Sequence, residues 1–202
     1  VITYLGAGTL TCVGTPKTFT YTVNPTATVN PVASQVVCNG ANTTAVNFSS
    51  PTTGGTIVYN WTNSAPSIGL AASGSGNIAS FVAVNVSPVP VVATITVTPA
   101  YTNGGVTCNG TPLTFTITVN PPPIINPVAN QVVCNNSPTT TVTFTSPSSG
   151  GIIVYNWTNS DPSIGLPVAG TGDILSFNAI NATNASVTAT ITVIMTYTNG
   201  GI

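Results

Sequence analysis

The sequence Tyr59-Asn60-Trp61-Thr62-Asn63-Ser64, followed by Pro66-Ser67-Ile68-Gly69-Leu70, occurs twice in this 202-residue chain. The second copy is Tyr155-Asn156-Trp157-Thr158-Asn159-Ser160, followed by Pro162-Ser163-Ile164-Gly165-Leu166, and the two copies hold the only tryptophans. Trp61 and Trp157 are 96 residues apart, and the same offset relates Cys38 to Cys134. A period of this length is the size of one small domain, so the chain is predicted to consist of copies of one unit.

The 96-residue period divides the chain into three parts. Residues 24–119 form one complete unit, which opens at an Asn-Pro sequence, where proline fixes the backbone and removes a hydrogen-bond donor. Residues 120–202 match this unit as far as Asn199-Gly200-Gly201, so they are predicted to form a second copy without its last strand. Residues 1–23 match the final strands of a preceding unit. We therefore expect the chain to be a window on a longer tandem array.

Within the unit, apolar and polar residues alternate as they do in half-buried strands. In residues 113–119 the apolar side chains share one face and the threonines the other, and comparable stretches occur at 35–38, 44–48, 57–62, 78–84 and 93–101. No stretch has the spacing of a helix. About seven short strands, with a tryptophan on the third, predict an all-β protein made of tandem immunoglobulin-like (PKD-like) β-sandwiches.

The repeated aromatic residues have two interpretations. Trp61 and Trp157 can be exposed platforms for sugar rings, whereas a third-strand tryptophan in an Ig-like sandwich fills the core. Tyr59 and Tyr155 share the strand face of the tryptophans, so the same choice applies to them. We favour the core for all four residues.

Charged residues are almost absent. Lys17, Asp161 and Asp173 are the only ones, and the net charge is -1. A chain with so few charges has no electrostatic field that would attract nucleic acid or an anionic lipid surface. Hydrophobic residues make up 42% of the chain and alternate strictly, which argues against disorder. No apolar run approaches the roughly 18 residues of a membrane span, so we expect no membrane insertion.

The inventory of reactive groups argues against an enzyme. The chain has no His, Glu or Arg, so its many hydroxyl groups lack a general base. Asp161 and Asp173 replace Ala65 and Asn77 of the first copy, which leaves too few carboxylates for glycoside hydrolysis or a calcium site. We predict no catalytic residue, no metal ligand and no cofactor.

The four cysteines, Cys12, Cys38, Cys108 and Cys134, are too far apart in sequence for a metal site and are predicted to form disulfides in an oxidising environment. Two pairings are open. Cys38 can pair with Cys108 inside one repeat. The first and last strands of an Ig-like sandwich are parallel, however, which would place these cysteines at opposite ends of the unit, beyond the roughly 7 Å that a disulfide allows between Cα atoms. Cys38 would then pair with the counterpart of Cys108 in the next repeat, and this chain would contain no disulfide.

Several motifs resemble a known repeat family. They are Cys38-Asn39-Gly40, the Asn60-Trp61-Thr62-Asn63-Ser64 segment, Cys108-Asn109-Gly110-Thr111-Pro112 and the threonine-rich strand that ends at Asn120-Pro121. Together they are similar to the PKD-like or Ig-like tandem repeats of large surface proteins of Bacteroidota, which include gliding-motility adhesins exported by type IX secretion. The resemblance implies an extracellular location on the bacterial cell surface.

The resulting expectation is a non-catalytic structural stalk segment of a long extracellular adhesin or surface filament. Its partners would be neighbouring repeats of the same chain, with surface polysaccharide or lateral self-association in addition. Two other functions are retained as alternatives. One is a carbohydrate-binding β-sandwich repeat. The other is a self-assembling filament subunit, in which each sandwich is completed by a strand from a neighbouring chain.

Overall fold

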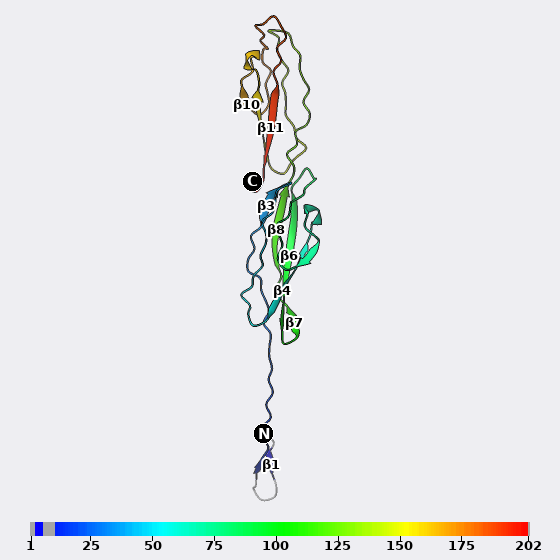
Figure 1. Ribbon diagram of the computed structural model, residues 1–202, viewed down its shortest axis with the longest axis vertical. Coiled ribbons are helices and arrows are strands. Elements are labelled where there is room, and N and C mark those ends of the chain that lie inside the picture. Colours follow the sequence, from blue (N-terminus) through cyan, green and yellow to red (C-terminus); the bar gives the residue numbers. More distant parts are fainter. Residues whose placement is uncertain (1–2, 6–10, 202) are drawn as a thin grey trace.

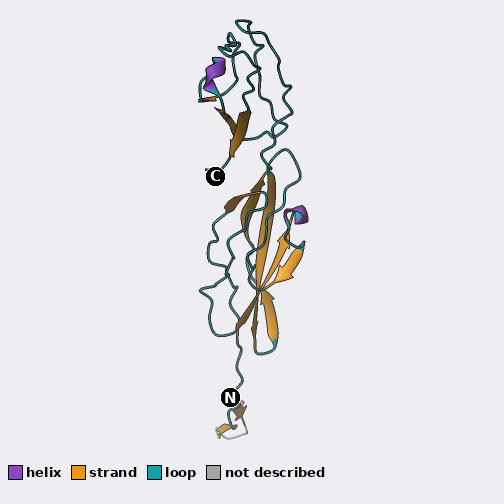
Figure 2. Cartoon of the chain, turned by 45° about the horizontal axis from the view of Figure 1, so that its top comes forward, coloured by secondary structure: helices purple, strands orange, loops and turns teal. Residues whose placement is uncertain are grey.

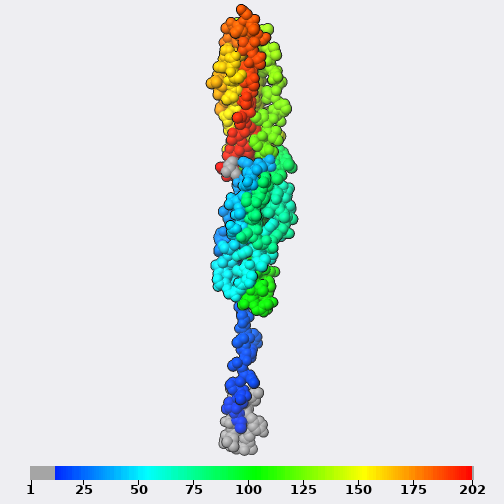
Figure 3. Space-filling model, in the orientation of Figure 1, coloured from blue at the N-terminus to red at the C-terminus, as the bar shows by residue number. Residues whose placement is uncertain are grey.

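The computed structural model of the chain describes residues 3–5 and 11–201 and has an elongated shape (Figures 1 and 3). It contains one sheet of six strands, one of three strands and a separate two-stranded hairpin. The only helical turns in the described residues are two short 3-10 segments, η1 (Pro66–Ile68) and η2 (Pro162–Ile164) (Figure 2). The predicted all-β class is therefore confirmed. No helix in the described part is long and apolar enough to cross a membrane.

The six-stranded sheet belongs to residues 24–119, hereafter the first repeat, and to Asn120, which follows it. Its strands lie in the order β3-β8-β6-β4-β5, and β7 pairs with the far end of β6. β3 and β8 run parallel, with Gln35 opposite Ile117, and the other pairs are antiparallel. The strands are β3 (Gln35–Cys38), β4 (Thr56–Asn63), β5 (Ser73–Ser75), β6 (Val91–Asn103), β7 (Val106–Asn109) and β8 (Leu113–Asn120).

The three-stranded sheet belongs to residues 120–202, hereafter the second repeat. Its strands are β9 (Ile152–Asn159), β10 (Ala169–Thr171) and β11 (Ile191–Thr198), in the order β10-β9-β11. Trp157 lies between Gly170 and Val193, as Trp61 lies between Gly74 and Val97 in the first repeat. The 96-residue sequence period is therefore also a period of strand register.

Two of the expected strands of the first repeat do not form. Residues 44–48 and 78–84 run antiparallel, but only the isolated bridges Asn42 to Val82 and Val46 to Ile78 join them. Backbone hydrogen bonds remain near these bridges, as from the Thr43 N–H to the Phe81 carbonyl at 2.9 Å, and side chains supply further ones. Thr43 Oγ1 accepts from the Phe81 N–H at 3.1 Å, and Asn77 Oδ1 accepts from the Phe48 N–H at 2.9 Å. The alternation of residues was correct, but short polar side chains compete with backbone pairing.

The cores of the two repeats differ in extent. Thirteen buried hydrophobic residues form one cluster in the first repeat, including Trp61 and three side chains of β8, whereas the corresponding cluster of the second repeat has four, including Trp157. Each fully buried aliphatic or aromatic side chain contributes roughly 1.5–3 kcal/mol. The described part of the second repeat therefore has much less apolar burial to stabilise it.

The ends of the chain lie far apart along the long axis. The N-terminal hairpin joins β1 (Thr3–Leu5) to β2 (Thr11–Val13), with Tyr4 opposite Cys12. An extended segment without strand pairing leads from this hairpin to the first repeat, and the C-terminal end lies where the two repeats meet (Figure 1). The expected leading fragment, residues 1–23, is described except for 1–2 and 6–10.

Candidate functional site: the joint between the repeats

Two asparagines hold the repeats together at their joint. Asn120, the last residue of β8, donates from Nδ2 to the Asn199 carbonyl at 3.2 Å, and Asn199 returns a hydrogen bond from its own Nδ2 to Asn120 Oδ1 at 3.0 Å. The Asn120 side chain is fully buried. Because an unsatisfied buried amide is costly, this reciprocal pair fixes the position of one repeat relative to the next.

The same pair of hydrogen bonds occurs a second time, one period earlier. Asn24 donates to the Asn103 carbonyl at 3.2 Å, and Asn103 Nδ2 donates to Asn24 Oδ1 at 3.1 Å. Asn24 and Asn103 precede Asn120 and Asn199 by 96 residues each. This pair of hydrogen bonds is therefore a repeated element of the structure. At Asn120 it links the end of β8 to the second repeat, and at Asn24 it links the extended leading segment to the end of β6.

Three further contacts surround the Asn120 to Asn199 pair. The Ser149 N–H donates to the Pro88 carbonyl at 2.8 Å. A Cβ added at Gly150 would lie 2.8 Å from Pro90, and one added at Gly200 would lie 2.9 Å from the Val36 side chain. Gly200 also has a φ of +66°, which disfavours other residues. The second repeat thus meets both the 87–90 loop and the β3 edge of the first repeat.

A tyrosine positions the loop that makes one of these contacts. The Tyr197 hydroxyl donates to the Ser149 carbonyl at 3.0 Å, and the ring packs against Gly151. Burial raises the pKa of Tyr197. Its counterpart Tyr101 is 2% exposed and donates to the Thr53 carbonyl at 3.3 Å. Each tyrosine therefore packs within its own repeat, and Tyr197 affects the joint only through the loop that it holds.

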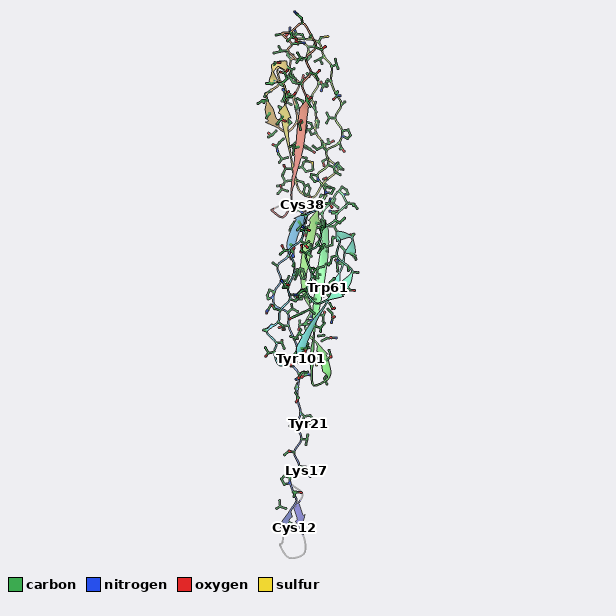
Figure 4. All side chains as sticks on the ribbon, in the orientation of Figure 1. Cys12, Lys17, Tyr21, Cys38, Trp61 and Tyr101 are labelled. Atoms are coloured by element: carbon green, nitrogen blue, oxygen red, sulfur yellow. The ribbon has the colours of Figure 1, made fainter. Side chains whose placement is uncertain are left out.

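The cysteines do not pair as the within-repeat alternative requires. All four are free in the described residues, with Cys108 half-buried and the others exposed. Cys38 ends β3 beside Asn120 at the joint, whereas Cys108 lies opposite Tyr101 at the other end of the repeat (Figure 4). The parallel pairing of β3 and β8 is the reason for this separation. The Cys38 to Cys108 pairing is therefore wrong for this structure.

The repeated aromatic residues lie in or against the cores. Trp61 and Trp157 are each 7% exposed, and the half-buried Tyr59 and Tyr155 pack against the same clusters. Phe48 contacts Tyr59 with ring centroids 5.5 Å apart. A shallow depression beside Trp61 is lined also by Gly74, Thr96 and Thr98, but the indole is largely buried and Gly74 lies against its ring.

The charged residues of the second repeat act on the local backbone. Asp161 Oδ1 accepts from the Ser163 N–H at 3.0 Å at the start of η2, and hydrogen bonds with Ser163 lower the pKa of this exposed carboxyl. Asp173 Oδ1 accepts from the Phe144 N–H at 3.0 Å, where the first repeat uses Asn77. Among the described residues, no three His, Cys, Asp or Glu side chains gather as a metal site would require.

Comparison of the chain with protein-family models finds no match, and comparison with curated proteins finds no relative. The resemblance to tandem repeats of bacterial surface proteins therefore rests on the repeated sequence motifs alone. The asparagine joint is not among the sites predicted from the sequence. Its signal was present, because Asn24 and Asn103 both recur after 96 residues, but asparagine is so common in this chain that two recurrences do not stand out.

Proposed function

We propose that the chain is a non-catalytic stalk segment, in which tandem Ig-like sandwiches form a rod that projects from a bacterial cell surface. The repeated asparagine joint carries this proposal. A bond made at Asn24 and again at Asn120 gives each unit the same connection to its neighbour, so that units add length along one axis. The extended arrangement of the repeats in Figure 3 agrees with this role.

The composition of the chain also supports a stalk. With Lys17, Asp161 and Asp173 as the only charged residues, a projecting rod has little electrostatic attraction or repulsion along its length. Location at the surface of a bacterium, export by type IX secretion and a part in adhesion follow only from the sequence resemblance. A carbohydrate platform would need an open aromatic face, and the burial of Trp61 and Trp157 weighs against it.

Small-angle X-ray scattering of the chain and of Asn120→Ala tests this proposal. The substitution removes both side-chain hydrogen bonds across the joint, so we expect a shorter and broader distribution of interatomic distances than for the wild type. Asn156→Ala, on the exposed face of β9, is the matched control and should leave the distribution unchanged. A wild-type chain that bends freely at the joint, or an Asn120→Ala chain that stays as straight as the wild type, would contradict the proposal.

A further inference from the structure

Four asparagines of the chain are followed directly by glycine, a sequence that favours loss of the asparagine side-chain ammonia. The glycine nitrogen attacks the side-chain carbonyl of the asparagine, and a glycine has no side chain to obstruct this approach. The four asparagines are Asn39, Asn103, Asn109 and Asn199. How readily each one reacts depends on how the fold holds the glycine nitrogen and the side-chain amide.

In two of the four sequences the glycine nitrogen is already engaged. The Gly40 N–H donates to the Ala83 carbonyl at 2.8 Å, and the Gly110 N–H donates to the Pro99 carbonyl at 2.7 Å. A nitrogen held in this way must leave its hydrogen bond before it can form a new bond to carbon. The fold therefore protects these two sequences at the attacking atom.

The glycines of the other two sequences lie in exposed turns. Gly104 begins the turn between β6 and β7, and Gly200 begins the equivalent turn after β11. Their φ angles are +58° and +66°, and both residues are exposed to solvent. Among the described residues, the N–H of neither glycine has a hydrogen-bond acceptor. The attacking atom is therefore available beside Asn103 and beside Asn199.

The side chains at these two positions are the ones that form the asparagine pairs. Asn103 Nδ2 donates to Asn24 Oδ1 at 3.1 Å, and Asn199 Nδ2 donates to Asn120 Oδ1 at 3.0 Å. This Nδ2 is the atom that leaves as ammonia in deamidation. Its hydrogen bond fixes the side chain and opposes the rotation that would bring the carbonyl carbon against the glycine nitrogen. A closed pair thus restrains the reaction, and an open pair allows it.

We propose that Asn103 and Asn199 are sites of spontaneous deamidation, each protected while its pair with Asn24 or Asn120 is closed. The glycine nitrogen loses its proton to water and bonds to the side-chain carbonyl carbon. The bond from that carbon to Nδ2 breaks, and ammonia leaves a cyclic succinimide behind. Water then opens the ring to aspartate or to isoaspartate. One water is consumed and one ammonia is released, so the reaction needs no other reagent.

The product cannot form the asparagine pair again. An aspartate at position 199 has a carboxylate oxygen in place of the Nδ2 donor, and this oxygen would face Asn120 Oδ1, which also only accepts. Asn120 is fully buried, so its Oδ1 would be left without a donor, at a cost in free energy. A joint that stays open long enough is therefore kept open by a covalent change. This inference depends on the asparagine pairs and not on the proposed role as a surface stalk.

The chain contains two asparagine pairs, so each serves as the control for the other. Asn120→Ala should speed deamidation of Asn199 at least about fivefold, the factor that corresponds to the net stability of one hydrogen bond, and should leave Asn103 at its wild-type rate. Asn24→Ala should do the reverse. Incubation at mildly alkaline pH with timed mass mapping measures all four Asn-Gly sequences in one sample. An unchanged rate at Asn199 in Asn120→Ala, or equal acceleration of all four sequences, would contradict the proposal.

Two further measurements do not require the alanine variants. Short synthetic peptides of the four Asn-Gly sequences lack the fold and should react at similar rates, whereas in the intact chain Asn39 and Asn109 should react more slowly than Asn103 and Asn199. The opposite order in the chain would overturn the proposal. Asn199→Asp imitates the product and should shorten the distance distribution in small-angle X-ray scattering. Asn109→Asp is the matched control, because it adds the same charge at an exposed position and should leave the distribution unchanged. An Asn199→Asp chain with the wild-type distribution would refute the claim that deamidation keeps the joint open.

Discussion

Gly74 lies directly against the indole ring of Trp61, and a Cβ at this position would come within 2.7 Å of Cε2 and 2.8 Å of Cη2. The two residues are paired across β4 and β5. Gly170 and Trp157 have the same relationship in the second repeat. The tryptophan that defines the sequence repeat is thus covered by a residue that has no side chain.

Replacement of Gly74 by alanine should destabilise the first repeat by about 1–3 kcal/mol, because the added methyl group overlaps the buried ring. This cost should exceed the roughly 0.4–1 kcal/mol that alanine gains by restricting the unfolded chain. Chemical denaturation followed by circular dichroism measures the difference. Ser75→Ala, on the exposed part of the same strand, should remain within about 0.5 kcal/mol of the wild type. A Gly74→Ala chain as stable as this control would show that the ring moves aside without cost.

Replacement of Tyr197 by phenylalanine should cost about 1 kcal/mol at neutral pH, because the hydrogen bond to the Ser149 carbonyl is lost. Burial raises the pKa of Tyr197, so the unfolded chain releases this proton at a lower pH than the folded chain does. The wild type should therefore lose stability as the pH rises above about 10, and the variant should lose less. Thermal unfolding at pH 7 and pH 10.5 measures both effects. An equal loss in the two proteins would mean that Tyr197 does not contribute to the pH dependence.

The Asp161 carboxyl should titrate below its ordinary pKa, because the hydrogen bonds with Ser163 favour the charged form. A lowered folded-state pKa adds stability above the unfolded pKa, and this stability is lost as the pH falls through the folded value. Carboxyl carbon NMR on the folded chain measures the titration directly. Ser163→Pro removes both the side-chain hydroxyl and the backbone N–H that donate to this carboxyl, so it should return the pKa of Asp161 toward its ordinary value. No change in that variant would assign the shift to another cause.

The thiols should differ in their rate of alkylation. Cys38 is exposed at the joint, whereas Cys108 is half-buried in β7. Iodoacetamide should therefore modify Cys38 before Cys108 in the reduced chain. Timed mass mapping of the cysteine peptides measures this order. Oxidation of the folded chain should produce no Cys38 to Cys108 bond within one molecule, because the two residues lie at opposite ends of the repeat. Recovery of that bond from a folded sample would contradict the parallel arrangement of β3 and β8.

The strands were predictable where alternation of residues and backbone pairing agree. The pattern of Phe115, Ile117 and Val119 identifies β8, and its parallel arrangement with β3 agrees with the order of strands expected for an Ig-like sandwich. Residues 44–48 alternate as well, but a single bridge at Val46 pairs them with the facing segment, and the Phe48 N–H donates to the Asn77 side chain instead of a strand partner. Alternation identifies the buried face of a segment. It does not show which groups satisfy its backbone.

The joint and the pairing of β3 were harder to predict because both depend on what lies beside a residue. Gln35 and Gln131 begin identical four-residue sequences, yet only the first sequence forms a strand. Asn120 and Asn199 are 79 residues apart, and although each recurs after 96 residues, this recurrence does not mark the two as partners. Local sequence gives a segment the capacity to form a strand. The presence of a pairing neighbour decides whether the strand forms.

The parallel pairing of β3 with β8 determines how the first repeat carries tension. The chain enters the repeat through the residues that lead to β3 and leaves it through Asn120 at the end of β8 (Figure 1). A pull on the two neighbours of the repeat therefore drags these adjacent strands in opposite directions along their lengths. The four paired positions between them, from Gln35 and Ile117 to Cys38 and Asn120, lie across the line of force. Their hydrogen bonds must break together under shear, whereas a hairpin pulled from its open end would unzip one bond at a time.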